Sequence, residues 1–210
     1  MIEVLLDSIE LRFGSYGVLS NLSFAVPRGQ FVALVGPTGC GKSSVLNLVA
    51  GLLKPSGGSV RTGGRPLDSI NRDAAYMLQQ DGLLPWKSVL ENVILGPLLR
   101  GIPRNQAAKD AEAWIERVGL RGLQARYPAQ LSGGQRKRVA MAQALINRLP
   151  ILLMDESFSS LDVQTRALME NKLLELWQEL GATVLFVTHD LEEAIAMADR
   201  VLLFTAGPDA

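Results

Sequence analysis

The run GPTGCGKSS at residues 36–44 has the residue types and the spacing of a loop that binds phosphate. Glycines in such a loop let backbone N–H groups curl around an anion without Cβ clashes. Lys42 can reach the outer phosphates of a nucleotide, and the Ser43 hydroxyl can be a ligand of Mg²⁺. We therefore predict a site for a nucleotide and magnesium. Its residues are Gly36, Pro37, Thr38, Gly39, Cys40, Gly41, Lys42, Ser43 and Ser44.

Two carboxylates and the single histidine of the chain each follow a run of apolar residues. The run ILLMDE at residues 151–156 ends in Asp155, which is suited to hold Mg²⁺ through water, and Glu156. Glu156 can accept a proton from, or orient, the water that attacks a γ-phosphate. His189 follows the run TVLFVT at residues 183–188. Because ligands bind at the carboxyl edge of open α/β sheets, we predict a γ-phosphate contact for His189.

A second pair of glycines stands in LSGGQ at residues 131–135, directly before a helical pattern. The Ser132 hydroxyl and the start of a helix both favour an anion, and Gly133 and Gly134 permit its close approach. The run itself contains no lysine. An ordinary helix cap at Ser132 is the alternative interpretation.

Strands that alternate with helices are needed to position these residues. The apolar runs at 31–36, 151–155 and 183–188 are typical of buried parallel strands, and an amphipathic helical pattern covers 163–180. We predict an α/β fold with a mostly parallel sheet and flanking helices. Near the N-terminus, SIELRF and NLSFAV predict an antiparallel β subdomain. The helical character of the middle of the chain predicts an inserted α-helical subdomain at 80–149, within a single domain whose core is 1–79 and 150–210.

Composition excludes several classes of protein. The 210 residues carry 21 Lys+Arg and 21 Asp+Glu, so no overall basic field favours nucleic acid. No signal peptide and no stretch of eighteen apolar residues is visible. Cys40 is the single cysteine, which excludes an internal disulfide, and it is interpreted as a small loop residue whose thiol lies beside Lys42. We expect a soluble cytosolic protein that contacts a membrane only through a partner.

Taken in order, GPTGCGKSS, LSGGQ, ILLMDE and VTHD resemble the nucleotide-binding subunit of ATP-binding cassette (ABC) transporters, over nearly the whole chain. The resemblance implies ATP and Mg²⁺ as cofactors and a P-loop NTPase core. It also implies a second ABC ATPase subunit, bound head to tail in what is expected to be a homodimer. In that arrangement LSGGQ of one subunit, including Gln135, covers the γ-phosphate held by the P-loop of the other.

Single positions also match the motifs of the family. Gln79 matches the Q-loop glutamine, which senses Mg²⁺ and the γ-phosphate, and Gln80 is the alternative. Phe13 matches the aromatic residue that stacks on adenine, with Tyr16 as second choice and a core role as the other interpretation of Phe13. Asp162, at the end of SSLD, matches a residue that reaches across the dimer.

The chain departs from the family pattern at Ser157, where proline is usual, at Gln143, where arginine is usual, and at Ser44, where threonine is commoner. None of these is a catalytic group, so we expect activity. The resemblance also implies further segments beyond VLLFTAGPDA, so we expect altered sheet-edge cover, stability or regulation.

The stretch LQQDGLLPWKSVLENV at residues 78–93 resembles importer ATPases of the nitrate, sulfonate and taurine type. Leu83, Leu84 and Trp86 form an apolar patch after a glutamine hinge, which suits a groove for a helix of a transmembrane permease. Packing of these residues inside the helical subdomain is the alternative. The resemblance implies a peripheral protein on the cytoplasmic face of the membrane, served indirectly by a solute-binding protein. Two other functions stay open: a soluble ABC ATPase that acts on DNA or ribosomes, and a regulatory cassette with reduced activity.

Overall fold

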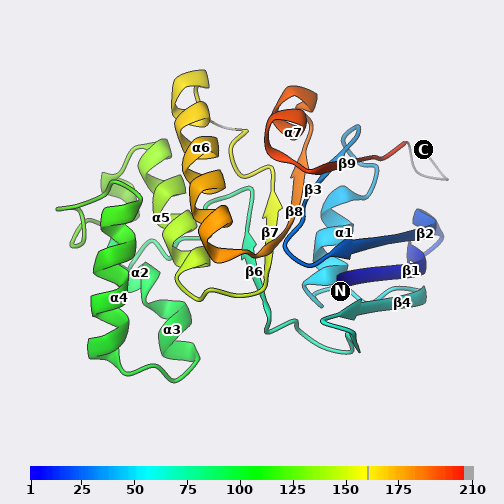
Figure 1. Cartoon of the computed structure of the whole chain (residues 1–210), viewed down its shortest axis with the longest axis horizontal. Coiled ribbons are helices and arrows are strands. Elements are labelled where there is room, and N and C mark those ends of the chain that lie inside the picture. The colour runs from blue at the N-terminus through cyan, green and yellow to red at the C-terminus, as the bar shows by residue number, and fades with distance from the viewer. Residues whose placement is uncertain (160, 206–210) are drawn as a thin grey trace. The chain divides into compact units, whose positions relative to one another are not determined.

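Figure 1 shows the computed structural model of the chain, which describes residues 1–159 and 161–205. The backbone divides into two compact units. The α/β unit comprises Met1–Tyr76, Pro150–Glu156 and Gly181–Ala210, and the helical unit comprises Met77–Leu149 and Ser157–Leu180.

A five-stranded sheet forms the centre of the α/β unit, in the order β6-β7-β8-β3-β9. These strands are β3 (Phe31–Val35), β6 (Ala74–Met77), β7 (Ile151–Asp155), β8 (Thr183–Thr188) and β9 (Arg200–Leu203). Strand β3 pairs in parallel with β8 and β9, and β7 pairs in parallel with β8. Every residue of β3 and β8 is buried, which is why both read as continuous apolar runs.

An antiparallel sheet occupies the N-terminal part, in the order β2-β1-β4-β5. Its strands are β1 (Ile2–Phe13), β2 (Tyr16–Pro27), β4 (Gly57–Thr62) and β5 (Arg65–Pro66). Helix α1 (Lys42–Val49) contributes Val45 and Leu46 to one hydrophobic core with Leu6 of β1 and Leu34 of β3. Helix α7 (Leu191–Met197) completes the unit. The predicted combination of a parallel sheet, flanking helices and an N-terminal antiparallel sheet is confirmed.

The helical unit contains five α-helices among the residues that the structure describes. They are α2 (Val89–Val93), α3 (Leu95–Leu99), α4 (Arg104–Arg117), α5 (Gly133–Leu145) and α6 (Val163–Leu180), with a short 3₁₀ helix at Pro128–Gln130. None of the helices in 1–159 and 161–205 has the length and apolarity needed to cross a bilayer.

Helix α6 groups with the helical unit, whereas the sequence-based division at 80–149 left it in the core. Two contacts give the physical reason. Arg117 of α4 pairs with Glu179 of α6. Thr165 of α6 packs on Gly134 of α5 so closely that a Cβ at Gly134 would lie 2.8 Å from the Thr165 Cγ2 atom. These contacts join residues far apart in sequence, so periodicity could not reveal them.

Candidate functional site

The phosphate-binding loop lies between β3 and α1. Gly39 and Gly41 have positive φ angles of 86° and 95°, a region that disfavours side chains, and Gly41 is the N-cap of α1. A Cβ at Gly36 would lie 2.5 Å from the Phe204 carbonyl oxygen. Glycine at these positions therefore lets the backbone turn tightly in front of the helix, as the motif predicts.

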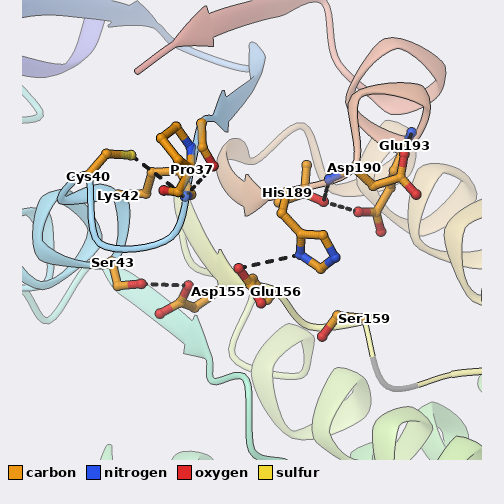
Figure 2. Close-up of polar contacts among 12 residues, drawn as sticks. Pro37, Cys40, Lys42, Ser43, Asp155, Glu156, Ser159, His189, Asp190 and Glu193 are labelled. Atoms are coloured by element: carbon orange, nitrogen blue, oxygen red, sulfur yellow. Dashed lines mark hydrogen bonds and ion pairs between the residues drawn. The ribbon is translucent and has the colours of Figure 1, made fainter. Parts of the chain in front are cut away.

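Lys42 is buried, and its ammonium is held inside this loop. The Nζ atom donates hydrogen bonds of 2.7 Å to the carbonyl oxygens of both Gly36 and Pro37 and lies 3.7 Å from the Cys40 sulfur. Figure 2 shows Pro37 and Cys40 beside the lysine. A buried ammonium at the start of a helix favours an anionic ligand.

Ser43 and Asp155 bring two oxygen atoms together at the ends of α1 and β7. The Ser43 hydroxyl donates a hydrogen bond of 3.0 Å to the Asp155 Oδ1 atom (Figure 2). Burial raises the pKa of Asp155, and the neighbouring Glu156 charge raises it further, while the Ser43 hydrogen bond and Lys42 oppose the shift. A carboxylate in this situation gains from a nearby cation.

The oxygen atoms of Ser43 and Asp155 are suited to a magnesium ion that binds together with a nucleotide. Among the described residues no group of three or more His, Cys, Asp or Glu side chains could hold a metal by itself. Mg²⁺ usually keeps several waters and takes one or two protein ligands together with substrate phosphates. Ser43 and Asp155 match that requirement.

Glu156 and His189 lie at the ends of neighbouring parallel strands. The pairing of Asp155 with Val187 sets the register, and the Glu156 amide donates to the Val187 carbonyl oxygen at 2.9 Å. The His189 Nδ1 atom is then 3.5 Å from the Glu156 Oε1 atom (Figure 2). Glu156 adopts a φ of 43°, a strained conformation that often marks functional positions.

A hydrogen-bond network fixes the backbone on both sides of His189, and sequence reasoning missed it. The Thr188 hydroxyl donates to Glu193 and accepts from the Asp190 amide at 3.0 Å, and both Thr188 and Glu193 are buried. The Asp190 Oδ1 atom caps α7 by accepting from the amides of Glu192 and Glu193. An aspartate N-cap followed three residues later by glutamate is a helix-start signal that could have revealed it.

In the helical unit, Ser132 is the N-cap of α5. Its hydroxyl accepts from the Gln135 amide at 3.2 Å, and the Gln135 Oε1 atom accepts from the Ser132 amide at 2.9 Å. The helix cap considered as an alternative is therefore present. It does not exclude an anion, because a cavity of about 450 Å³ lies at the same place. The cavity is lined by Ser132, Gly133, Gly134, Gln135, Arg138 and Asp162, among others.

The two aromatic candidates lie opposite each other at the turn between β1 and β2. Phe13 is 53% exposed and Tyr16 is 48% exposed, so Phe13 is not a core residue. Either ring is accessible to a base, and the choice between them stays a prediction. Gln79 and Gln80 are exposed residues of the helical unit, and the metal role of Gln79 also stays a prediction.

Ser157, where proline is usual, fits its position. Its hydroxyl donates to the Met77 carbonyl oxygen at 3.3 Å, and the residue is fully buried. Residues 206–210, the end of VLLFTAGPDA, lie outside the described residues, and the expectation of altered sheet-edge cover, stability or regulation stays a prediction.

Comparisons with known proteins agree with this geometry. The family described as "ABC transporter" matches residues 19–159. The aliphatic sulfonates import ATP-binding protein SsuB of Escherichia coli (strain K12) is 48% identical over 204 residues, which are 97% of this chain and 78% of that protein. The uncharacterized ABC transporter ATP-binding protein MJ0412 of Methanocaldococcus jannaschii is 42% identical over 207 residues, 99% of this chain and 78% of that protein.

Solved structures show the same fold. The dimeric structure of MJ0796, a bacterial ABC transporter cassette, has a TM-score of 0.86 at 30% identity and covers 96% of this chain and 94% of that one. A post-hydrolysis state of the same cassette, bound to ADP and Pi, has a TM-score of 0.84 at 32% identity over the same shares. The chain therefore belongs to the ABC transporter family and has the fold of its ATP-binding cassette.

Proposed function

We propose that this protein binds and hydrolyses ATP to drive a membrane importer for a small anion such as a sulfonate, taurine or nitrate. The observation that carries the proposal is the meeting of Lys42, the Ser43–Asp155 pair and the Glu156–His189 pair at one edge of the parallel sheet. The name of the E. coli relative supports an aliphatic sulfonate as the solute.

Each residue at this edge has a role that follows from its position. The Lys42 ammonium and the loop amides hold the charge of the β- and γ-phosphates. Ser43 and Asp155 would hold Mg²⁺, which would neutralise phosphate charge. Glu156 orients the attacking water and accepts its proton, while His189 contacts the γ-phosphate. Phe13 or Tyr16 stacks on the adenine.

The cavity at Ser132 lies beside LSGGQ, called the signature motif from here on, and serves a second copy of the subunit. It combines Ser132, two glycines, the start of α5 and the Arg138 side chain, all of which favour an anion. We propose that it covers the γ-phosphate held by the P-loop of the partner, head to tail, with Asp162 beside the same interface. The dimeric state of the solved MJ0796 cassette supports this arrangement.

The permease contact is proposed at the segment that follows Gln79. Trp86 is 70% exposed, which favours an interface and disfavours packing inside the helical unit. The segment is held in shape by the buried Asn92 side chain, which accepts from the Leu84 amide at 2.8 Å and donates to the carbonyl oxygens of Leu84, Lys87 and Ser88. A preorganised loop with an exposed tryptophan is suited to anchor a partner helix.

A second exposed apolar site lies in the same unit at the turn between α3 and α4. Leu99 and Ile102 are exposed there and would make the contact, whereas Trp114, which lines a cavity of about 500 Å³ together with Ile102, is only 3% exposed and belongs to the core of the helical unit. We propose that both places bind permease helices. The protein would then be peripheral on the cytoplasmic face of the membrane, with the solute-binding protein reached only through the permease, and no nucleic acid takes part.

Uptake in cells tests this function. Cells that carry the importer genes are supplied with radiolabelled taurine, an alkanesulfonate or nitrate, with this chain intact or replaced by Lys42→Ala. We expect uptake of one of these anions to require the intact chain, because Lys42 holds the phosphates. Equal uptake of all three anions with both chains would contradict the proposal.

A further inference from the structure

A buried lysine of α5, the helix that begins in LSGGQ, contacts the segment 78–86 within the helical unit. This segment contains Gln79 and is called the Q-loop below. Lys137 of α5 is only 3% exposed. Its Nζ atom donates a hydrogen bond of 2.6 Å to the Gln79 carbonyl oxygen and lies 3.0 Å from the Asp81 Oδ1 atom. The ammonium therefore contacts both the backbone of the proposed sensor residue and the carboxylate two positions later.

The Asp81 carboxylate is shared with a second cation of the same helix. Its Oδ2 atom accepts from Arg136 Nε at 3.0 Å. Arg136 in turn donates through Nη1 to the carbonyl oxygen of Leu131, the first residue of LSGGQ, at 2.9 Å. One carboxylate thus connects the Q-loop with the residues on both sides of the Ser132 cap.

The bonds of Lys137 to Gln79 and Asp81 restrict the movement of the Q-loop relative to α5. Asp81 keeps Arg136 as a partner when Lys137 is removed, so the loss of the lysine is expected to act on the loop locally and not to leave an unpaired buried carboxylate. Residues 78–86 have neither helix nor strand, so side-chain bonds from α5 are important for their position. Lys137 is not among the residues that line the cavity at Ser132, and its partners are Gln79 and Asp81, so we assign it no catalytic role.

We propose that Lys137 and Asp81 are positioning residues. They hold the Q-loop against α5, so that Gln79 and LSGGQ move together. This inference rests on the proposed function, because Gln79 and Ser132 matter to ATP only in an ABC ATPase. A permease helix that displaces the Trp86 segment would thereby displace the signature motif as well. Movement of the permease helix would then be transmitted to LSGGQ by the ion pair between Lys137 and Asp81, and not by a change in the shape of the whole unit.

The test compares Lys137→Met with Lys172→Met in the full chain. Methionine keeps the apolar stem of the buried lysine and removes its charge. Lys172 is a matched control because it is also ion-paired in the helical unit, with Glu175 at 2.9 Å, but lies on α6. Hydrogen exchange of peptides that cover 78–84 should be about fivefold faster in Lys137→Met, since a hydrogen bond that contributes about 1 kcal/mol is lost, and unchanged in Lys172→Met.

Turnover supplies a second readout. In Lys137→Met we expect kcat for ATP to fall about tenfold, while KM stays within about twofold, because an interaction made only in the transition state is affected. The phosphate loop, which binds ATP in the ground state, is untouched. Asp81→Asn should give the same pattern more weakly, since Lys137 keeps its bond to Gln79, and this variant carries the test if Lys137→Met does not fold.

Three results would overturn the inference. The first is unchanged exchange in 78–84. The second is faster exchange throughout the helical unit together with a lower melting temperature, which would make Lys137 a general stabiliser. The third is an equal change of kcat in Lys172→Met. If the wild-type chain hydrolyses no ATP, the proposed function fails, but the exchange experiment still decides whether Lys137 holds the Q-loop.

Discussion

The Glu156 Oε1 atom lies 3.5 Å from the His189 Nδ1 atom, across the ends of two neighbouring parallel strands. Glu156 has a positive φ of 43°, an unusual conformation for a residue with a side chain, directly after Asp155 at the end of β7. Asp155 and Glu156 are adjacent in sequence but have different partners, Ser43 for the first and His189 for the second. This difference supports the roles proposed above, a ligand of the metal for Asp155 and a partner of the attacking water for Glu156.

This division of roles predicts the effect of Glu156→Gln. The amide keeps the size of the side chain but cannot accept the proton of the attacking water, so ATP turnover should fall about 10²- to 10⁴-fold. ATP binding should persist, because Lys42 and the loop amides are unchanged. Equilibrium dialysis and steady-state turnover measure the two quantities. Glu175→Gln, on an exposed part of α6, is the control, and near-normal turnover in Glu156→Gln would refute the assignment.

Asp155→Asn should stabilise the free protein while it abolishes hydrolysis. Because the pKa of Asp155 is raised in the folded state, the folded state retains the proton at pH values where the unfolded chain has lost it. Stability contributed by Asp155 is therefore lost as the pH rises from the ordinary value of 3.8 through the raised value. Without nucleotide, the variant should melt about 2 °C higher at pH 7 and differ little below that window. A lower melting temperature at pH 7 would contradict the sign.

A thiol reagent should inhibit turnover through Cys40. The sulfur is buried in the phosphate loop near Lys42, and it would lie 3.1 Å from a Cβ placed at Gly36, so an added group has no room without moving the loop. N-ethylmaleimide should inactivate the wild type, and MgATP should slow the reaction by closing the loop around phosphate. Cys40→Ser should remain active and resist the reagent. Full labelling of Cys40 without loss of turnover would place the thiol away from nucleotide.

Thr188→Val should lower turnover although it leaves His189 intact. Valine removes both the donor to Glu193 and the acceptor for the Asp190 amide, so the buried Glu193 loses a partner and the loop at His189 loosens. Loss of such a buried hydrogen bond typically costs about 1–3 kcal/mol. Thr188→Ser keeps the hydroxyl and should restore both kcat and melting temperature. A fall in stability with unchanged kcat would limit the network to a structural role.

The sequence predicted those parts of the molecule that depend on local patterns. The three strands FVALV, ILLMD and TVLFVT could be predicted because strands buried in a parallel sheet consist mostly of apolar residues. The helix that follows LSGGQ could be predicted because Ser132 and Gln135 cap it reciprocally. Long-range contacts were missed. The bond from Lys137 to the Gln79 carbonyl spans 58 positions, and no periodicity or propensity encodes such a pairing.

The grouping of α6 was missed for the same reason. Its amphipathic pattern shows that one face is buried but not which helices cover it, and the ion pair between Arg117 and Glu179 supplies that information. The network at Thr188 is an intermediate case. Its helix cap is local and can be predicted from the order of Asp190 and Glu193, whereas its proposed effect on turnover depends on the role of the neighbouring His189.

Trp86→Ser should separate coupling from chemistry. Because Trp86 is 70% exposed, removing its ring takes little surface from the core, and the melting temperature of the free subunit should change by no more than about 1 °C. ATP binding should be unchanged, since the phosphate loop is untouched. Recovery with the permease in a pull-down should fall at least tenfold, because truncated aromatic anchors at interfaces often cost about 2 kcal/mol or more.

The matched control is Trp114→Ser in the same helical unit. Trp114 is 3% exposed, and the Arg117 guanidinium stacks on its ring at 4.6 Å, so its loss should destabilise the free subunit by about 3–5 kcal/mol. The two tryptophans thus predict opposite outcomes, an interface defect for Trp86 and a folding defect for Trp114. If Trp86→Ser melts as early as Trp114→Ser, or if it binds the permease as well as the wild type does, the segment after Gln79 is not the anchor of the transmembrane partner.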